Sequence, residues 1–320
     1  MTKPMKSYLD FEKPIAELDT RVAELRATQD GSSDIDIEAE IAKLAAKSEA
    51  MLASTYGKLT PWQKTQVARH PLRPHFVDYV EMAFTDFVPL GGDRLYGEDC
   101  AILGGFARLN GQRVMLIGHE KGNDTGSRVK HNFGMAKPEG YRKAIRLMEM
   151  ASKFGLPVVT LVDTAGAFPG IEAEERGQAE AIARSTEACL ALGVPMVAAI
   201  VGEGGSGGAV AIAAANKVLM LEHSVYSVIS PEGASSILWR TPEKAADAAT
   251  AMKVTAQDLL ELKVIDGIVE EPLGGAHRNP AKTAKALATA IEKELAKLAK
   301  LGAEALVRQR EERFLAIGSL

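Results

Sequence analysis

A run of glycines between two apolar segments has the residue types of a backbone binding site. Five of the seven residues from Gly202 to Gly208 are glycine. Glycine has no Cβ, so another molecule can touch its amides directly. The apolar run 195–201 enters this stretch and the small residues 209–215 leave it, which predicts a helix starting at Ser206 to Gly208. The first amides of a helix lack acceptors within it, so we expect an anion or a developing oxyanion to bind here.

The same letters fit three kinds of site. Gly202-x-Gly204-x-x-Gly207 matches the dinucleotide fingerprint, with Glu222 as the acid that would bind a ribose. Gly204-x-Ser206-x-Gly208 matches the nucleophile elbow of hydrolases, with Asp266 and His277 following in the right order. The third kind is a pair of backbone amides that stabilise an enolate. Close packing of a helix on a sheet needs no ligand and stays open as well.

Two of these interpretations meet difficulties in the sequence. A dinucleotide fold opens with its fingerprint on the first strand, whereas at least three strands are predicted before Gly202. A hydrolase needs a histidine held on Ser206, but His277 lies in the linker 274–280. Nucleotide hydrolysis is disfavoured too, because no lysine completes a phosphate-binding loop beside Asp163-x-x-Gly166.

A second loop, from Asp163 to Gly170, follows the predicted strand 157–163. It is interpreted either as a helix cap and turn or as a loop facing the glycine stretch at the carboxyl edge of a parallel sheet. The basic loop 121–137 is expected to be solvated rather than to bind phosphate or an acidic partner. His119 and His223 are expected to be packed or surface histidines. Trp62 and Trp239 are expected to be core or interface anchors.

The elements that must position these loops are helices first and then alternating strands and helices. Residues 10–86 are predicted to be helical with a break at Gly31-Ser32-Ser33-Asp34, forming a wrap or a dimer arm. The core is expected to begin near residue 99 as a largely parallel, buried sheet. Asn110-Gly111 predicts a two-residue hairpin. The predicted strands are 101–108, 113–119, 157–163, 195–201, 218–222, 225–229 and 264–269, and the main predicted helices are 138–154, one ending near 192, and 280–315.

Composition limits the class of protein. The chain has 320 residues, 46% hydrophobic residues and a net charge of −4, which is typical of a soluble globular protein and gives no reason to expect a nucleic acid partner. The two cysteines, Cys100 and Cys189, have no spacing that would build a zinc site or a disulfide framework. We find no export signal or membrane span in the sequence and expect a cytoplasmic protein.

Several strings of residues together resemble one family. The strings are Gly118-His119-x-Lys121-Gly122, Asn132-Phe133-Gly134-Met135-x-x-Pro138-Glu139-Gly140-Tyr141-Arg142-Lys143-Ala144, Asp163-Thr164-x-Gly166-Ala167-x-Pro169-Gly170, Gly202–Gly208, Tyr226–Gly233 and Glu271–Pro280. Because it carries these strings in this order, the chain resembles the alpha subunits of bacterial acetyl-coenzyme A carboxylase carboxyltransferases. The resemblance runs from Leu9-Asp10-Phe11-Glu12 through the predicted helix at 281–300.

The resemblance implies a crotonase-like (ClpP/crotonase) α/β fold of ββα units. Its parts would be a helical N-terminal extension at 1–95, the carboxyltransferase core at 96–278 and a long C-terminal helix at 279–320. It implies transfer of a carboxyl group from carboxybiotin on the biotin carboxyl carrier protein to acetyl-coenzyme A, giving malonyl-coenzyme A, the first committed step of fatty acid synthesis. The alternatives are another acyl-coenzyme A carboxyltransferase, a hydratase or isomerase using Glu203, or a non-catalytic scaffold.

The resemblance also implies partners and site residues. Activity would require a zinc-ribbon-bearing beta subunit in an α2β2 assembly, with biotin carboxylase in the full complex, so no metal is expected on this chain. The oxyanion-stabilising amides would be Gly207 and Gly208. The carboxybiotin side would be shaped by Gly204, Gly205, Gly166 and Ala167. Ala165 and Phe168 stand where the family usually has proline and tyrosine, so no tyrosine hydroxyl can act there.

Overall fold

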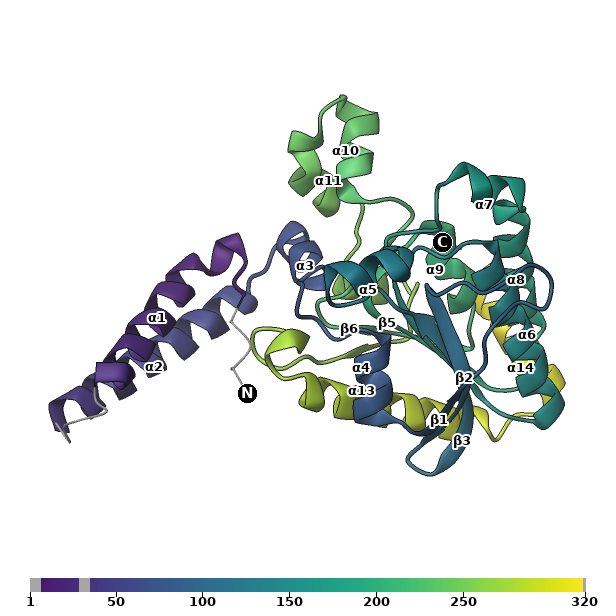
Figure 1. The fold of residues 1–320 in the computed structure, drawn as a ribbon, viewed down its shortest axis with the longest axis horizontal. Coiled ribbons are helices and arrows are strands. Elements are labelled where there is room, and N and C mark those ends of the chain that lie inside the picture. The colour runs from purple at the N-terminus through teal and green to yellow at the C-terminus, as the bar shows by residue number, and fades with distance from the viewer. Residues whose placement is uncertain (1–6, 29–34, 319–320) are drawn as a thin grey trace.

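The computed structural model describes residues 7–28 and 35–318, and their strands form one eight-stranded sheet (Figure 1). Its order is β1-β2-β3-β4-β5-β6-β8, and β7 pairs with the end of β5. β1 to β3 pair antiparallel, and from β3 onward all pairs are parallel. The strands are β1 (Thr85–Pro89), β2 (Ile102–Leu109), β3 (Gln112–His119), β4 (Val158–Thr164), β5 (Met196–Gly205), β6 (Lys217–Leu221), β7 (Val225–Ser227) and β8 (Gly267–Val269).

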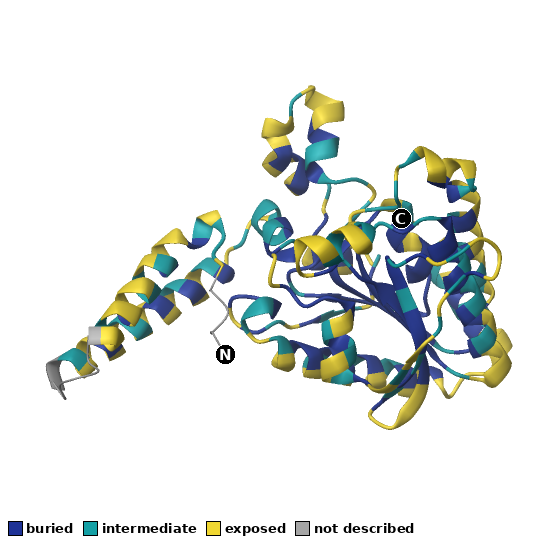
Figure 2. Cartoon of the chain, viewed as in Figure 1, coloured by how far each residue is buried: buried dark blue, intermediate teal, exposed yellow. Residues whose placement is uncertain are grey.

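Helices cover both faces of this sheet and bury it. Alternate residues of β5 point to opposite sides, so Met196 and Ala198 pack with one helical layer while Val197 and Ala199 pack with the other. The first layer contains α6 (Pro138–Phe154), α8 (Gln178–Ala191), α9 (Ser206–Ala213) and α12 (Ala256–Glu261). The second contains α4 (Phe76–Ala83) and α13 (Pro280–Leu298). Figure 2 shows the buried residues concentrated in the sheet and on the helix faces against it.

The N-terminal helices form an arm that projects from the body (Figure 1). α1 (Lys13–Thr28) and α2 (Ile35–Tyr56) pack on each other, and Ile15 and Leu52 are buried. The predicted break at residues 31–34 lies outside the described residues. A single-turn helix, Asp10–Glu12, anchors the arm, because the buried Glu12 carboxylate accepts hydrogen bonds from Tyr56 and Arg278.

One small lobe and two separate short helices border the carboxyl edge of the sheet. α10 (Pro231–Trp239) and α11 (Ala245–Ala251) rise above the body in Figure 1, next to α3 (Pro61–Ala68). α5 (Thr125–Lys130) and α7 (Ile171–Glu175) follow β3 and β4. Trp239 is 39% exposed and Trp62 is half-buried, so neither is a core residue, and an interface role for them stays a prediction.

Most predicted elements are present, and the hairpin is confirmed. Asn110 and Gly111 both adopt positive φ, 46° and 84°, as a two-residue turn between β2 and β3 requires. The helix predicted over 138–154 is α6 with the same bounds. The strand at 195–201 continues to Gly205, so the first four residues of the glycine stretch belong to β5, and α9 begins at Ser206 as predicted.

Three predictions of local structure were wrong. The region 10–86 is not wholly helical, because β1 begins at Thr85 and adds an edge strand to the sheet. The single helix predicted to end near 192 is two helices, α7 and α8, with Gly177 at positive φ between them. The long helix predicted over 280–315 is also two, α13 and α14 (Ala303–Leu315), separated at Gly302. The domain boundaries themselves stay predictions.

Candidate active site

The glycine stretch crosses from the sheet into a helix at the carboxyl edge. Gly202 to Gly205 complete β5, and Ser206 then takes a left-handed φ of 51° as the first residue of α9. The amides of Ser206, Gly207 and Gly208 therefore open the helix and have no acceptor within it. Gly207 is half-buried, and Gly208 is buried. This arrangement points free backbone donors and the positive end of the α9 dipole toward one region.

The loop from Asp163 to Gly170 packs directly against this stretch, as one of its two interpretations predicted. A Cβ on Gly205 would lie 2.2 Å from the carbonyl oxygen of Ala165. A Cβ on Gly208 would lie 2.7 Å from the carbonyl carbon of Gly166 and 2.8 Å from the amide nitrogen of Ala167. Real Cβ atoms do not approach other atoms so closely, so both positions require glycine for packing.

A chain of charged side chains lies beneath the two loops. The buried carboxylate of Asp163 accepts the Glu203 amide at 2.9 Å and lies 2.8 Å from Lys121 Nζ. Lys121 also lies 3.0 Å from a carboxylate oxygen of Glu203. Lys121 joins the end of β3 to β4 and β5, and its side chain is only 15% exposed. The expectation of a solvated basic loop is therefore wrong for Lys121, because two acids compensate its burial.

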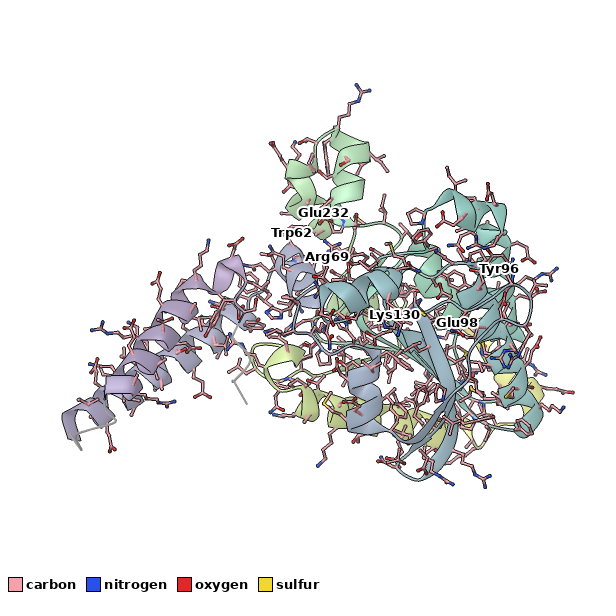
Figure 3. The ribbon with its side chains drawn as sticks, in the orientation of Figure 1. Trp62, Arg69, Tyr96, Glu98, Lys130 and Glu232 are labelled. Carbon is pink, nitrogen blue, oxygen red and sulfur yellow. The ribbon has the colours of Figure 1, made fainter. Side chains whose placement is uncertain are left out.

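The charged chain continues to the α10–α11 lobe. Arg69, just after α3, donates to Glu203 at 2.6 Å and to Glu232 at 2.6 Å. Figure 3 shows Arg69 and Glu232 near each other at the base of the lobe. Burial alone would raise the pKa of Glu203, but Lys121 and Arg69 outweigh it and hold that pKa below its usual range. Glu203 is thus kept ionised and fully paired, which is a poor state for a general acid or base.

A cavity of about 450 Å³ opens on the other side of the α9 start, and we name it the Gly207 cavity. Of the six residues predicted for the site, Gly207 is the one that lines it. Gly204 and Gly205 border a much smaller hollow, while the Gly166 amide donates to Thr164 Oγ1. The cavity wall is mostly apolar and comes from Ser206, Gly207, Val210, Tyr226, Ser227, Val228, Met252, Lys253, Leu259 and Val264.

Sequence reasoning assigned no site role to most of this wall. Val210 and Val228 are plain apolar residues 18 positions apart in the chain, and Met252 and Leu259 are on other elements. Tyr226 to Val228 stand within one of the strings that carry the family resemblance, which is the one signal available in the sequence. A cavity of this size and polarity is typical of small-molecule sites in proteins.

The two disfavoured interpretations find no support in the geometry. His277 stacks on His70 with ring centroids 3.7 Å apart, and Asp266 is held by Lys217 and Arg313, so neither acts on Ser206. Glu222 accepts the amide of Glu271 rather than facing a glycine turn. His119 and His223 are buried, as expected of packed histidines, and burial lowers the pKa of His119 to about 4.

Comparison with known proteins decides the family. The family model described as acetyl co-enzyme A carboxylase carboxyltransferase-like matches residues 8–318. The acetyl-coenzyme A carboxylase carboxyl transferase subunit alpha of Erythrobacter litoralis is 72% identical over 98% of this chain and 100% of its own length. The same subunit of Zymomonas mobilis is 66% identical over 98% of the chain and 100% of its own length. The chain belongs to the acetyl-coenzyme A carboxylase carboxyltransferase alpha-subunit family.

Solved structures share the fold of this alpha-subunit family chain. A transcarboxylase 12S structure aligns with a TM-score of 0.56 and 18% identity, covering 72% of the chain and 44% of that protein. A Pseudomonas malonate decarboxylase hetero-tetramer aligns with a TM-score of 0.56 and 17% identity, covering 69% of the chain and 89% of that protein. At such identities the likeness concerns the fold, and it confirms the predicted fold class.

Neither a metal-ligand cluster nor a membrane-spanning helix is found among the described residues. No cluster of three or more His, Cys, Asp or Glu side chains in residues 7–28 and 35–318 is arranged to hold a metal ion. Within the same residues, no helix has the length and apolar character needed to cross a lipid bilayer.

Proposed function

We propose that this carboxyltransferase alpha subunit supplies the carboxybiotin half of a site whose other half lies on a beta subunit. The observation that carries the proposal is the junction of β5 and α9, where the half-buried Gly207 lines an apolar cavity of about 450 Å³. Free helix-start amides suit a developing oxyanion, and apolar walls suit a bicyclic ring. The substrates would be carboxybiotin on the carrier protein and acetyl-coenzyme A.

In this mechanism the chain acts through its backbone. When bound, carboxybiotin would supply the carboxyl group, its freed ring nitrogen would take up the proton that the acetyl methyl group loses, and negative charge would develop on its ureido oxygen. The amides of Gly207 and Gly208 donate to that oxygen at the start of α9. Gly205 and Gly208 hold the loop carrying Gly166 and Ala167 against the stretch, so these residues fix the position of the donors. The wall residues Val210 and Val228 exclude water from the ring.

The competing enzyme class is less well supported by the geometry. A hydratase or isomerase would need Glu203 as its acid or base, but Lys121 and Arg69 pair with both of its carboxylate oxygens. A pure scaffold for the beta subunit would need neither free amides nor a cavity beside them. The carboxyltransferase role therefore accounts for the most features of the site.

One reconstitution separates these functions. The chain is purified alone and with a beta subunit, and malonyl-coenzyme A-dependent carboxylation of free biotin is measured. We expect activity in the complex and none with either chain alone. Activity of the isolated chain on acyl-coenzyme A thioesters would instead identify a hydratase-like enzyme. An inactive complex that still forms would identify a scaffold.

A further inference from the structure

A second pocket lies at the carboxyl edge, separate from the Gly207 cavity. It has a volume of about 230 Å³, and none of its lining residues also lines the Gly207 cavity. We name it the Arg128 pocket. The side chains that matter for its chemistry are Arg69, His75, Lys121, Arg128, Phe133 and Glu203. Since a water occupies about 30 Å³ in the liquid, the pocket has room for a small polyatomic ligand.

Most charges in the wall of this pocket already have partners. Glu203 pairs with Arg69 and Lys121, and Lys121 also pairs with Asp163 behind the wall. The second histidine in the wall, His70, uses both ring nitrogens, with Ser7 O and the Leu72 amide. These charges and ring nitrogens are therefore already paired and do not need a ligand in the pocket.

Arg128 is different from the other cations in the wall. Its guanidinium makes one hydrogen bond to the described part of the chain, from Nε to the carbonyl oxygen of Gly122 at 3.3 Å. It has no carboxylate within ion-pair distance in residues 7–28 and 35–318. Its charge and its terminal N–H groups are therefore available to an acceptor in the pocket.

His75 supplies the second unfilled position. Its side chain is 8% exposed, and Nδ1 lies 3.1 Å from Asp163 Oδ2. An ionised carboxylate only accepts hydrogen bonds, so Nδ1 carries a proton, and in the neutral imidazole Nε2 then keeps a lone pair. Nε2 is buried and has no hydrogen-bond partner, although the ring lines the pocket. A buried polar atom of this kind calls for a ligand or an ordered solvent molecule.

The rim of the pocket carries an unusual backbone. Asn132, Phe133 and Gly134 are consecutive residues with positive φ, at 47°, 55° and 79°. Phe133 lines the pocket, and its side chain is 51% exposed. Such backbone strain is concentrated at binding and catalytic sites, which agrees with a ligand-binding role for this edge.

We propose that the Arg128 pocket binds a protonated oxyanion, such as hydrogen phosphate or bicarbonate. The anionic oxygens would accept from the Arg128 guanidinium, and the remaining hydroxyl would donate to His75 Nε2. An oxyanion without a proton can satisfy Arg128 but not His75. This binding is distinct from the carboxyl transfer assigned to the Gly207 cavity and does not depend on it.

The test is isothermal titration of the full chain at pH 7 and constant ionic strength, with phosphate, bicarbonate and sulfate as separate ligands. Sulfate matches phosphate in size and charge class but has no hydroxyl at this pH. We expect saturable binding of phosphate or bicarbonate that is at least about tenfold tighter than that of sulfate. The tighter of the two identifies the ligand within the class.

Variants locate the binding. Arg128→Met should weaken it by at least about tenfold, whereas Lys130→Met, which removes an exposed charge from the same helix (Figure 3), should leave it unchanged. Circular dichroism confirms that both variants are folded. Equal affinity for sulfate, full affinity in Arg128→Met, or no saturable binding of phosphate or bicarbonate up to about 50 mM would each overturn the proposal.

Discussion

Gly208 packs so closely on Ala167 that a Cβ on Gly208 would lie 2.8 Å from the Ala167 amide nitrogen. This contact joins the start of α9 to the loop after β4, and it fixes the relative position of the two loops. The two loops are therefore held together by contacts between backbone atoms. The side chains of Asp163, Lys121 and Glu203 support the loops through buried ion pairs.

Gly208→Ala should separate the two loops. The added methyl group must displace the backbone of Gly166 and Ala167, which we expect to cost about 1–3 kcal/mol of stability and most of the activity of the complex. Gly97→Ala is the matched control, because a Cβ there meets no atom within 4 Å. Thermal unfolding and malonyl-coenzyme A formation check the outcome. A Gly208→Ala protein indistinguishable from Gly97→Ala would show that the contact is not required.

Lys121→Met should leave two neighbouring carboxylates without their shared cation. Removing one partner of a buried charge group costs about 3–5 kcal/mol, and Asp163 and Glu203 are both largely buried. We expect a large fall in the urea midpoint and partial rescue by Lys121→Arg. Lys130→Met, an exposed residue on α5, is the control. An unchanged midpoint in Lys121→Met would contradict the role given to this charged chain.

The buried pair Arg73–Glu271 predicts how stability responds to acid. Burial alone would raise the pKa of Glu271, but Arg73 dominates and lowers it from 4.5 to about 2. A lowered folded pKa means that the stability is present above pH 4.5 and is lost as pH falls toward 2, by about 3 kcal/mol in all. Urea unfolding between pH 3 and 7 measures this loss.

Glu271→Gln isolates that contribution. The variant should be less stable than the wild type at pH 7, and the difference should shrink as the pH falls from 4.5 toward 3, because the Glu271 carboxylate takes up a proton in the unfolded wild-type chain while it stays ionised in the folded one. Glu187→Gln, at an exposed residue of α8, should follow the wild type at every pH. A constant difference between Glu271→Gln and wild type across this range is the result that the ion-pair account does not allow.

Val210→Trp should fill the Gly207 cavity. Val210 lines the cavity and is 38% exposed, so the larger ring can enter the open space without disturbing the core. We expect at least about tenfold slower carboxylation of free biotin by the complex, with little change in thermal stability. Val129→Trp, on the exposed face of α5, provides the control. Unimpaired biotin carboxylation by Val210→Trp would place the ring elsewhere.

Local signals in the sequence were sufficient for much of the fold. Asn110-Gly111 predicted the β2–β3 turn because both residues tolerate positive φ, and the apolar run after Pro195 predicted a strand leading to the glycine stretch. β1 was missed because Thr85–Pro89 is a short edge strand whose residues are largely exposed, so it lacks a buried apolar pattern. The interruption at Gly302 was missed because the apolar stripe continues on both sides of it.

The site was less predictable, for a physical reason. The glycines indicated a site made of backbone amides, and the loop after the predicted strand 157–163 was expected to face them. Both predictions depend only on residues that are close together in the sequence. The pairing of Lys121 with Glu203, however, spans 82 residues and exists only after three strands align. The wall of the Gly207 cavity likewise joins distant apolar residues that no spacing rule distinguishes from core residues.

Gly207→Val tests the central claim most directly. The added side chain would crowd the start of α9, which carries the proposed donors, because a Cβ on Gly207 would lie 3.3 Å from Ile182 Cγ2, a side chain that can shift. Losing an oxyanion donor typically costs about 10²–10³ in turnover. We predict that the Gly207→Val chain still assembles with the beta subunit, as judged by co-elution, but forms malonyl-coenzyme A at least about 100-fold more slowly. A co-eluting Gly207→Val complex with the wild-type rate of malonyl-coenzyme A formation would contradict the account.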